Sequence, residues 1–444
     1  TGSSSRRDRL TRSLRLWNAW LVTLSRAAPP FLPIPRIQPF RRSTIFHPPS
    51  VPIRPRTVKI GHYAPRLWAS GGVATYIRRL GESQMARGHD VLYLSRDEEE
   101  AIDRTDVHRV QSFPDLFAQA DQRGLDILHL HDYAPPSSDR GVPVVRTMHN
   151  HHASCPSGSR YLARPGRPCN RIPSVSGCLY GHAVDRCGSV RPSRAFHSLN
   201  RFQHEVEAAS EVLTLPVSHF LRERMIEAGC AADDLRVILS PAPEVDGPFR
   251  PVDRASVPRF LFLGRLAPQK GLEWLLRSFA QLSVDAHLDI AGTGDLLEPS
   301  RQLAHDLEIE DRVTFHGWID ADRIPSLISA CRAVVFPSVW HEPAGLVSLE
   351  AAAHGRSLVA SRVGGIPEYA TEDNAIFVSP NDTTALTDAL RTLALNPDRA
   401  DTLGRRGWDL ARSRFSMDKF LNQMDDVYES LLPKRLRGAY STAP

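Results

Sequence analysis

Short apolar runs alternate with longer amphipathic stretches along the first half of this chain. The apolar runs are TVKIGHY (57–63), GHDVLYLS (88–95), LDILHLHDY (125–133) and VPVVRTMHN (142–150). Each is rich in large or β-branched apolar residues, which is typical of buried strands. After Gly71-Gly72, the apolar residues Val73, Ile77 and Leu80 fall on one face of a helix. Strand, glycine turn, helix and strand predict the opening of a parallel α/β sheet.

The same rhythm returns after a break rich in proline and glycine. The segment SPAPEVDGPFRPVDR (240–254) predicts an interdomain linker, and LRVILS (235–240) just before it predicts a strand. The later apolar runs are RFLFLG (259–264), AHLDIAG (286–292), VTFHGWI (313–319) and ACRAVVFP (330–337). An amphipathic stretch follows the first of them, and residues 381–432 read as nearly continuous helix. We therefore expect two α/β domains that meet near residue 243.

Length and charge agree with two folded domains and exclude some partners. A chain of 444 residues with 41% hydrophobic residues is long enough for two cores. It has no apolar run of about eighteen residues, so a transmembrane helix is not expected. The net charge is +5, and the first 56 residues hold eleven arginines and one acid. The remainder is close to neutral, which argues against nucleic acid as a partner of the folded part.

Residues 1–56 are predicted to be an appendage. Proline recurs from Pro29 to Pro55, which indicates an extended arm. Earlier in this segment, arginines surround apolar residues spaced by three and four: Leu10, Leu14, Trp17, Leu21 and Leu24. Such a basic amphipathic helix is suited to an anionic membrane surface. A disordered extension or a misassigned start is an equal alternative, and a transit peptide is a third. We expect a cytoplasmic protein, with this arm as a candidate contact to the inner face of the membrane.

The stretch 333–368, AVVFPSVWHEPAGLVSLEAAAHGRSLVASRVGGIPE, carries the strongest chemical signal. An apolar run ends at Pro337-Ser338, and a loop with Glu342 leads to a helical pattern predicted to start at Pro343. Free backbone N–H groups at a helix start suit a phosphate. Glu342 and Glu350 bracket this start, and carboxylates accept hydrogen bonds from hydroxyls. A diphosphate flanked by hydroxyls fits this pattern; two ordinary acids beside a turn are the alternative.

Two cations and two histidines follow other predicted strands. Arg265 and Lys270 lie in GRLAPQKG (264–271), at the end of RFLFLG. Their charges would bind a diphosphate and offset the charge that grows as it leaves, although exposed cations on a turn are the simpler interpretation. His131 and His149 end their strands, where open α/β sheets bind ligands. A histidine there can position a hydroxyl or exchange a proton with it.

Residues 151–194 interrupt the α/β pattern and contain four of the six cysteines. Cys155, Cys169, Cys178 and Cys187 are spaced by 14, 9 and 9 residues, without the paired C-x2-C clips of most zinc sites. A structural zinc ion held by the four thiolates is one prediction. Two disulfides are the rival, and they are disfavoured in a cytosolic protein. In either case the insertion directly follows the predicted strand that ends in His149.

Three segments in this order resemble one family. HEPAGLVSLEAAAHG (341–355), with GRLAPQKG upstream and VGGIPE (363–368) downstream, resembles the retaining glycosyltransferases of family 4. The resemblance covers roughly residues 57–432. It implies the GT-B fold, an α/β architecture of two Rossmann-like domains that face each other across a cleft. The implied parts are an acceptor-side domain at 57–243, a nucleotide-sugar domain at 244–414 and a C-terminal segment at 415–444 whose helix crosses back.

The resemblance also assigns roles to residues. It implies catalytic roles for Glu342, His149, Arg265 and Lys270. The donor-binding residues that it implies are Gly72, Arg265, Lys270, Gly317, Gly345, Leu346 and Glu350. Glu342 would hold the transferred sugar and Glu350 the ribose. With Arg265 and Lys270 neutralising the phosphates, no catalytic metal is required, and no Asp-x-Asp stands in a metal-binding role.

The expected function is transfer of a sugar from a nucleotide diphosphate to an acceptor hydroxyl, with retention of anomeric configuration. Family analogy points to cell-surface polysaccharide or glycolipid synthesis, and so to a saccharide or lipid-linked acceptor. A sugar-nucleotide 2-epimerase of the same architecture is one alternative. A non-catalytic protein that binds sugar nucleotides or docks at a membrane is another.

Overall fold

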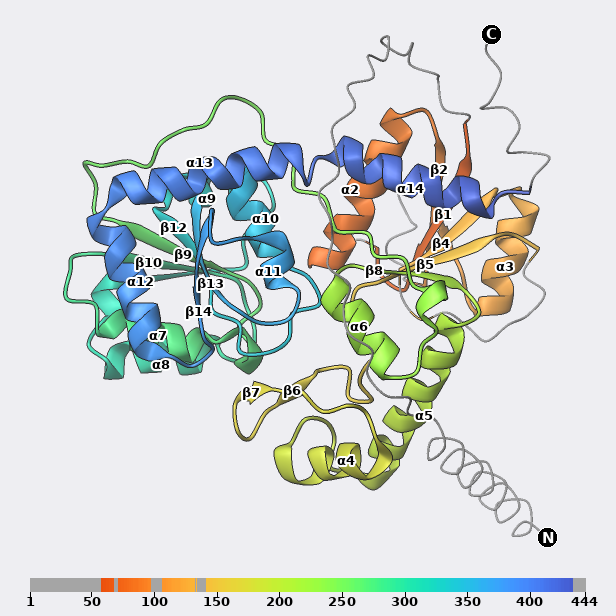
Figure 1. The fold of residues 1–444 in the computed structure, drawn as a ribbon, viewed down its shortest axis with the longest axis horizontal. Helices are drawn as coiled ribbons and strands as arrows, with labels where there is room; N and C mark the ends of the chain where they lie inside the picture. Colours follow the sequence, from red (N-terminus) through yellow and green to blue (C-terminus); the bar gives the residue numbers. More distant parts are fainter. Residues whose placement is uncertain (1–56, 68–70, 97–105, 132, 134–140, 434–444) are drawn as a thin grey trace, which may run out of the picture. The chain divides into compact units, whose positions relative to one another are not determined.

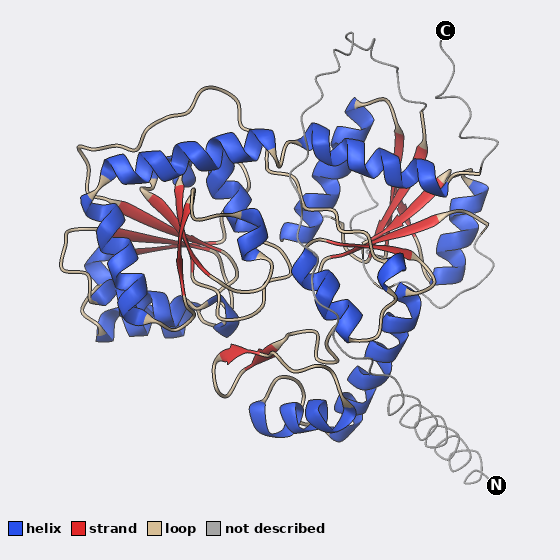
Figure 2. Cartoon of the chain, in the orientation of Figure 1, coloured by secondary structure: helices blue, strands red, loops and turns tan. Residues whose placement is uncertain are grey.

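A computed structural model describes residues 57–67, 71–96, 106–131, 133 and 141–433 of the chain. The arm at residues 1–56, on which the membrane-surface prediction rests, lies outside the described residues. Among the described helices, none combines the length and apolar composition needed to cross a membrane. Two six-stranded parallel sheets organise the described part, as Figures 1 and 2 show.

The first sheet has the strand order β3-β2-β1-β4-β5-β8, and every pairing in it is parallel. Its strands are β1 (Lys59–Ala64), β2 (Asp90–Ser95), β3 (Val107–Arg109), β4 (Ile127–Leu130), β5 (Val144–Met148) and β8 (Leu213–Pro216). The helices that accompany it are α2 (Gly72–Ala86), α3 (Phe113–Gln122), α5 (Pro192–Ala209) and α6 (His219–Glu227). The chain order reverses between β1 and β4, and the carboxyl ends of strands at such a reversal are where open α/β sheets bind ligands.

The second sheet repeats this topology with the order β11-β10-β9-β12-β13-β14, again all parallel. Its strands are β9 (Arg259–Leu263), β10 (His287–Ala291), β11 (Val313–Gly317), β12 (Ala333–Phe336), β13 (Ser357–Ser361) and β14 (Ala375–Val378). The helices of this half are α7 (Leu272–Ala280), α8 (Leu297–Asp306), α9 (Ile324–Ala330), α10 (Leu346–Ala353), α11 (Ile366–Tyr369), α12 (Thr383–Leu395) and α13 (Pro397–Ser413). The predicted fold class, two Rossmann-like domains, is confirmed.

Strand alternation explains how each sheet is covered on both faces. In β9, Phe260 and Phe262 pack with α7 and α12, whereas Leu261 between them packs with α9, α10 and α11 on the opposite face. Figure 1 shows α7, α8 and α12 gathered on one side of this sheet. Successive side chains of a strand point to opposite faces, so apolar residues at every position predict a sheet covered twice. Helices on both faces bury the strands, so a ligand can reach the sheet only at the ends of its strands.

Two segments depart from the regular repeat. The insertion contains a hairpin of β6 (Tyr161–Leu162) and β7 (Arg167–Pro168), then α4 (Val175–Tyr180) and a π-helical turn at Gly181–Asp185. The strand predicted at 235–240 is wrong, because only an isolated bridge joins Thr214 and Leu235. Because β8 ends at Pro216, the hydrogen bonds from Arg236 to the Thr214 carbonyl and from Ile238 to the Pro216 carbonyl are not continued into a ladder.

The last helix, α14 (Met417–Leu431), packs on the first sheet and not on the second. Its apolar side chains share a core with Ile60 of β1 and with Ile77 and Leu80 of α2. Figure 1 shows α14 directly after α13 in the chain and beside α2. The chain therefore returns to its first domain after completing the second.

Candidate active site at the carboxyl ends of the strands

A tight turn after β9 positions the two predicted cations. Arg265 follows the strand end and is exposed, and Lys270 ends a short 3-10 turn at Pro268–Lys270. Gly271 comes next with φ 72°, and a Cβ at this position would lie 1.9 Å from the carbonyl oxygen of Pro337. Only glycine combines that backbone conformation with such a close approach. This contact holds the turn against the end of β12.

Lys270 and Glu342 meet in an ion pair. The Lys270 Nζ lies 2.7 Å from Glu342 Oε1, and the two side chains are 19% and 7% exposed. The hydroxyl of Ser338 donates to the same carboxylate oxygen. The Lys270 Nζ also lies 5.4 Å from the centre of the Trp340 ring. The structure thus brings together two of the predicted residues, one from each of two separate sequence segments.

The glycines of VGGIPE fix the backbone of Glu342. The Gly365 N–H donates to the Glu342 carbonyl at 2.7 Å. A Cβ at Gly364, whose φ is 57°, would lie 2.3 Å from that carbonyl oxygen. The acid of this segment, Glu368, accepts hydrogen bonds of 2.7 Å from the backbone N–H groups of His219 and Phe220 at the start of α6. Glu368 therefore caps a helix of the first domain.

The predicted start of the following helix needs a correction. Helix α10 begins at Leu346 with Gly345 as its N-cap, so Pro343 is not the first helical residue. The reason is tertiary: the Pro343 carbonyl accepts a hydrogen bond of 2.6 Å from Ser218 Oγ of the first domain. The Ser348 hydroxyl, in the first turn of α10, is buried and has no hydrogen-bond partner among the described residues. One buried polar group at this helix start is thus left without a protein partner among the described residues.

Gly72 and Leu346 approach each other from the two domains. A Cβ at Gly72, the first residue of α2, would lie 3.0 Å from Leu346 Cδ1. Gly72 is exposed. Gly317 ends β11 with φ 67° and has open space where a Cβ would stand. These glycines keep the backbone accessible beside the strand ends.

Glu350 has a partner that the sequence analysis missed. The Arg79 Nη1 of α2 lies 3.3 Å from Glu350 Oε1, and the two side chains are 40% and 25% exposed. Arg79 stands in an ordinary helical stretch, and nothing in the sequence distinguishes it from its neighbour Arg78. Glu350 does not join the Lys270–Glu342 pair, so the two predicted carboxylates occupy separate charge environments.

The first sheet carries histidines at the corresponding edge. The His149 Nε2 lies 3.2 Å from His131 Nδ1, and the His131 Nε2 lies 3.0 Å from His62 Nδ1. The His62 Nε2 is 2.7 Å from Gln84 Oε1 of α2. The network continues through Gln84 Nε2, which donates to the hydroxyl of Tyr428 in α14 at 3.0 Å. The predicted His149 therefore ends a buried chain of hydrogen bonds that reaches the last helix.

The orientation of Gln84 sets the tautomers along this chain. Because Gln84 Oε1 can only accept, His62 must donate from Nε2 and accept at Nδ1. His131 then donates from Nε2 and accepts at Nδ1, and His149 donates from Nε2. His149 is left with Nδ1 as a hydrogen-bond acceptor. His62 and His129 were both missed by the sequence analysis. His129 was detectable, because in HLH (129–131) it is two residues before His131 and alternate residues of a strand share one face.

All of these histidines are neutral at physiological pH. Burial lowers the pKa of His149 to about 3 and, with partial opposition from the Gln84 hydrogen bond, lowers the pKa of His62 to about 4. Burial, aided by the neighbouring imidazoles, holds the pKa of His131 and of His129 well below 6.5. This edge of the site is therefore polar without being charged.

His62, His129 and His131 also form a candidate metal cluster, since their ligand atoms lie within 4.8 Å of one another. Their ring nitrogens already have protein partners, however. Beyond the contacts described above, His129 bonds to the Tyr428 hydroxyl at 2.8 Å and to Thr147 Oγ1 at 2.7 Å. A trio whose six nitrogens are all engaged is a hydrogen-bond network and has no lone pairs left for a metal ion.

The insertion borders the Glu342 loop. The His151 Nε2 donates to the His341 carbonyl at 2.7 Å, and the His341 Nε2 donates to Asn170 Oδ1 at 2.6 Å. His341 immediately precedes Glu342, and Asn170 immediately follows Cys169. The cysteine-containing segment therefore contacts the loop that carries the buried carboxylate.

Comparisons with known proteins agree with this architecture. The model of the family described as glycosyl transferases group 1 matches residues 257–396, and that of Glycosyltransferase Family 4 matches residues 70–241. An uncharacterised glycosyltransferase of Methanocaldococcus jannaschii is 27% identical over 82% of this chain and 97% of its own. A GDP-mannose-dependent phosphatidylinositol monomannoside mannosyltransferase of Mycobacterium tuberculosis is 29% identical over 49% of this chain and 61% of its own.

Solved structures share the fold at lower identity. The sucrose-phosphate synthase of Thermosynechococcus elongatus superposes with a TM-score of 0.65 at 22% identity, covering 85% of this chain and 99% of its own. The Anabaena protein HepE, solved with UDP and glucose, superposes with a TM-score of 0.61 at 19% identity, covering 84% of this chain and 100% of its own.

Proposed function

The chain belongs to the glycosyltransferases of group 1, family 4, and on that premise we propose how its residues divide the reaction. The C-terminal sheet edge binds the nucleotide diphosphate of the donor, and the N-terminal sheet edge receives the acceptor hydroxyl. The bond between the anomeric carbon and the diphosphate breaks, and a bond to the acceptor oxygen forms on the same face. The departing diphosphate keeps the electron pair of the broken bond, and its oxygen takes up the proton that the acceptor hydroxyl loses.

The observation that carries this proposal is the ion pair between Lys270 and Glu342. Both side chains are largely withdrawn from water. A buried ion pair contributes little to stability, since desolvation of the two charges offsets their attraction. Its position at the carboxyl ends of β9 and β12 is where open α/β sheets bind ligands. A ligand-binding role explains the pair better than a stabilising one.

The donor would be held by charge and by hydrogen bonds. Lys270 and the exposed Arg265 offset the negative charge that develops on the departing diphosphate. The amides at Gly345 and Leu346, and the backbone at Gly72, approach the phosphates at the start of α10. Glu342 accepts hydrogen bonds from hydroxyls of the transferred sugar, and Glu350 from the ribose. In this arrangement the protein's own cations supply the neutralising charge.

The acceptor would meet an uncharged imidazole. His149 Nδ1 is the free acceptor in the tautomer that Gln84 imposes through His62 and His131, so it can receive a hydrogen bond from a sugar hydroxyl. Its depressed pKa keeps that nitrogen unprotonated across the physiological range. His149 is therefore proposed to orient the acceptor hydroxyl.

The class of acceptor is a proposal from relatives. The Mycobacterium tuberculosis relative is named for a mannolipid acceptor, and a relative in Rhizobium meliloti, 31% identical over 39% of this chain, is named for lipopolysaccharide core biosynthesis. We propose a saccharide or lipid-linked acceptor for this protein as well. The basic arm at residues 1–56 would then bring the enzyme to the inner face of the membrane that holds such an acceptor.

The test is binding and slow hydrolysis of a panel of UDP-, GDP- and ADP-sugars by the purified protein, with and without chelator. One donor is expected to bind and to be hydrolysed in both conditions. Isolation of a 2-epimer of the sugar nucleotide would favour the epimerase. Absence of binding by any donor, with and without a saccharide acceptor, would favour the non-catalytic alternative.

A further inference from the structure

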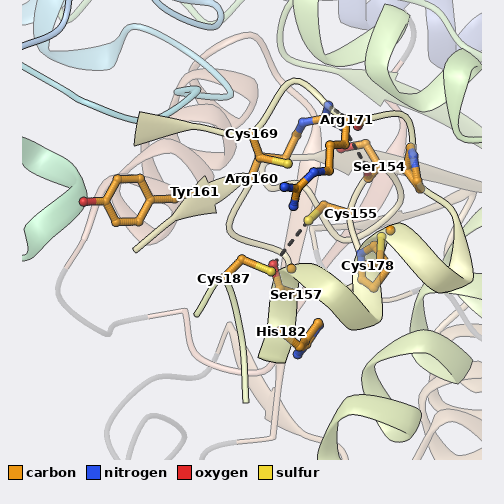
Figure 3. Close-up of a pocket in the computed structure, with 14 residues that line it drawn as sticks. Ser154, Cys155, Ser157, Arg160, Tyr161, Cys169, Arg171, Cys178, His182 and Cys187 are labelled. Atoms are coloured by element: carbon orange, nitrogen blue, oxygen red, sulfur yellow. Dashed lines mark hydrogen bonds between the residues drawn. The ribbon is translucent and has the colours of Figure 1, made fainter. Parts of the chain in front are cut away.

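Four thiols surround one small cavity in the insertion. Figure 3 shows Cys155, Cys169, Cys178 and Cys187 around this space, which encloses about 20 Å³. That volume accommodates one ion or one water. The four cysteines come from separate local elements: a loop after β5, the end of the β6–β7 hairpin, helix α4 and the segment after the π-helical turn. None of them is in a disulfide.

We propose that these four cysteines bind a structural zinc ion, which ties the insertion together beside the active site. Zinc in structural sites takes four thiolates in a tetrahedron. The insertion has little regular structure of its own: a hairpin of two-residue strands, one short helix and a π-helical turn. A crosslink of this kind is how small irregular segments acquire a fixed shape.

The surroundings of the cavity suit a site with negative charge. Four thiolates around one Zn²⁺ leave two net negative charges. Arg160 lines the cavity, is buried, and donates from Nη1 to the Ser154 carbonyl at 2.9 Å and from Nη2 to the Arg171 carbonyl at 3.1 Å. Its Nε is buried without a partner among the described residues. A guanidinium held in this way, with one N–H unsatisfied, would offset the charge of the thiolates and could donate to a sulfur.

Other groups crowd the sulfurs at close range. The Ser157 hydroxyl lies 3.3 Å from Cys155 Sγ. A Cβ at Gly181 would lie 3.0 Å from Cys187 Sγ, so a larger residue there would push that sulfur by a few tenths of an ångström. Because zinc binds thiolates, loading of the site would release the protons of the four thiols.

Coordination requires the sulfurs to move inward. Among the described residues, ligand atoms of three or more side chains come within 4.8 Å of one another in the histidine trio of the first sheet and not at the four cysteines. The four sulfurs therefore border the cavity without meeting at one point. Zn–S bonds of about 2.3 Å place tetrahedral sulfurs roughly 3.8 Å apart. Loading is thus expected to contract and order the insertion.

This site bears on the reaction through its position. Asn170, next to Cys169, accepts the hydrogen bond from His341, which adjoins Glu342. The Gly166 carbonyl, in the hairpin turn, accepts a hydrogen bond of 3.0 Å from Asn381 Nδ2. An ordered insertion would hold the Glu342 loop in place, so the zinc ion is structural and takes no part in the chemical step.

The experiment is metal analysis of the full-length protein purified under reducing conditions. One zinc per chain is expected, released when a mercurial reagent blocks the thiols. Reconstitution of the apoprotein with Co²⁺ should give the intense thiolate-to-cobalt absorption of tetrahedral sulfur coordination. Cys169→Ser and Cys178→Ser are expected to lose the zinc. Cys331→Ala, which removes a buried cysteine of the second domain, should retain it and serves as the matched control.

Several results would overturn the proposal. They are substoichiometric zinc that cannot be restored by added Zn²⁺, iron in place of zinc, or mass-spectrometric detection of two disulfides among the four cysteines. Retention of zinc by both Cys169→Ser and Cys178→Ser would also contradict the proposal. Because metal content is measured without turnover, an inactive but zinc-loaded protein would contradict the proposed reaction and leave the metal site standing.

Discussion

The two sheets of this protein have the same strand order, yet their carboxyl edges differ in charge. The C-terminal edge holds a nearly buried ammonium and carboxylate, Lys270 and Glu342, 2.7 Å apart. The N-terminal edge holds imidazoles that burial keeps neutral, with the pKa of His149 lowered to about 3. The same topology therefore provides one charged edge and one uncharged edge.

In the proposed division of the reaction, the difference in charge matches what each edge would bind. A departing diphosphate gains negative charge, which fixed cations stabilise strongly where water is excluded. An acceptor hydroxyl is neutral and needs orientation, for which an uncharged acceptor nitrogen suffices. Charge on the N-terminal edge would attract the phosphates to the wrong side. The comparison predicts that removal of charge and removal of a neutral hydrogen bond have unequal effects.

The largest effect is expected for Lys270→Ala. Loss of this cation removes charge stabilisation from the leaving diphosphate and leaves Glu342 unpaired, so turnover should fall by roughly 10²–10³. Steady-state kinetics and thermal unfolding measure the effect and the integrity of the fold. Arg277→Ala, which removes an exposed cation paired with Glu273 on α7, is the matched control. Unchanged turnover in a folded Lys270→Ala protein would refute the donor-site assignment.

A smaller effect is expected for His149→Ala. Removal of one neutral hydrogen bond to the acceptor should lower transfer by about tenfold, whereas donor hydrolysis in the absence of acceptor should change little. Parallel assays of transfer and hydrolysis separate the two edges of the site. His204→Ala, on the exposed surface of α5, is the control. Equal losses in both assays would show that His149 serves the donor and would break the comparison.

The pH dependence of stability tests the neutrality of the N-terminal edge. In the unfolded chain these histidines take up protons as the pH falls through 6.5, whereas folded His62 does so only near 4. Between these two pKa values the unfolded state binds more protons than the folded state. The free energy of unfolding should therefore decrease as the pH is lowered from 7 to 5. For each such histidine, the slope is expected to approach ~1.4 kcal/mol per pH unit toward pH 5. Urea unfolding between about pH 7 and pH 5 measures it; a flat profile would contradict the assignment.

The smallest effect is expected for Arg79→Ala. The pair with Glu350 is partly exposed, so its loss should change the free energy of unfolding by less than about 1 kcal/mol. If Glu350 holds the ribose, the donor KM should shift only a few-fold, because the carboxylate itself remains. A double-mutant cycle with Glu350→Gln measures the coupling. If Arg79→Ala lost as much turnover as Lys270→Ala, the Arg79–Glu350 pair, and not Lys270 with Glu342, would be the main donor-binding group.

The local sequence pattern was sufficient to predict which helices and strands form. It was not sufficient to predict where some of them begin or end. The strand at Ala333–Phe336 and the helix that follows Gly71 are both found in the structure. The start at Pro343 was wrong because a hydrogen bond from Ser218, 125 residues earlier, holds that segment outside the helix. The roles assigned to the site residues stay predictions, although the structure brings Lys270 to Glu342 and Gly72 to Leu346.

The sequence by itself determined two α/β domains, because apolar runs and helical periodicity are local properties of the chain. It also placed the polar residues at strand ends, which parallel topology gathers at one edge. Only the tertiary structure decided which side chains meet. Glu350 pairs with a residue 271 positions away, and His149 connects to Tyr428 through Gln84. Such contacts depend on strand register and on the return of α14 to the first domain, and no local pattern encodes the distance between two side chains.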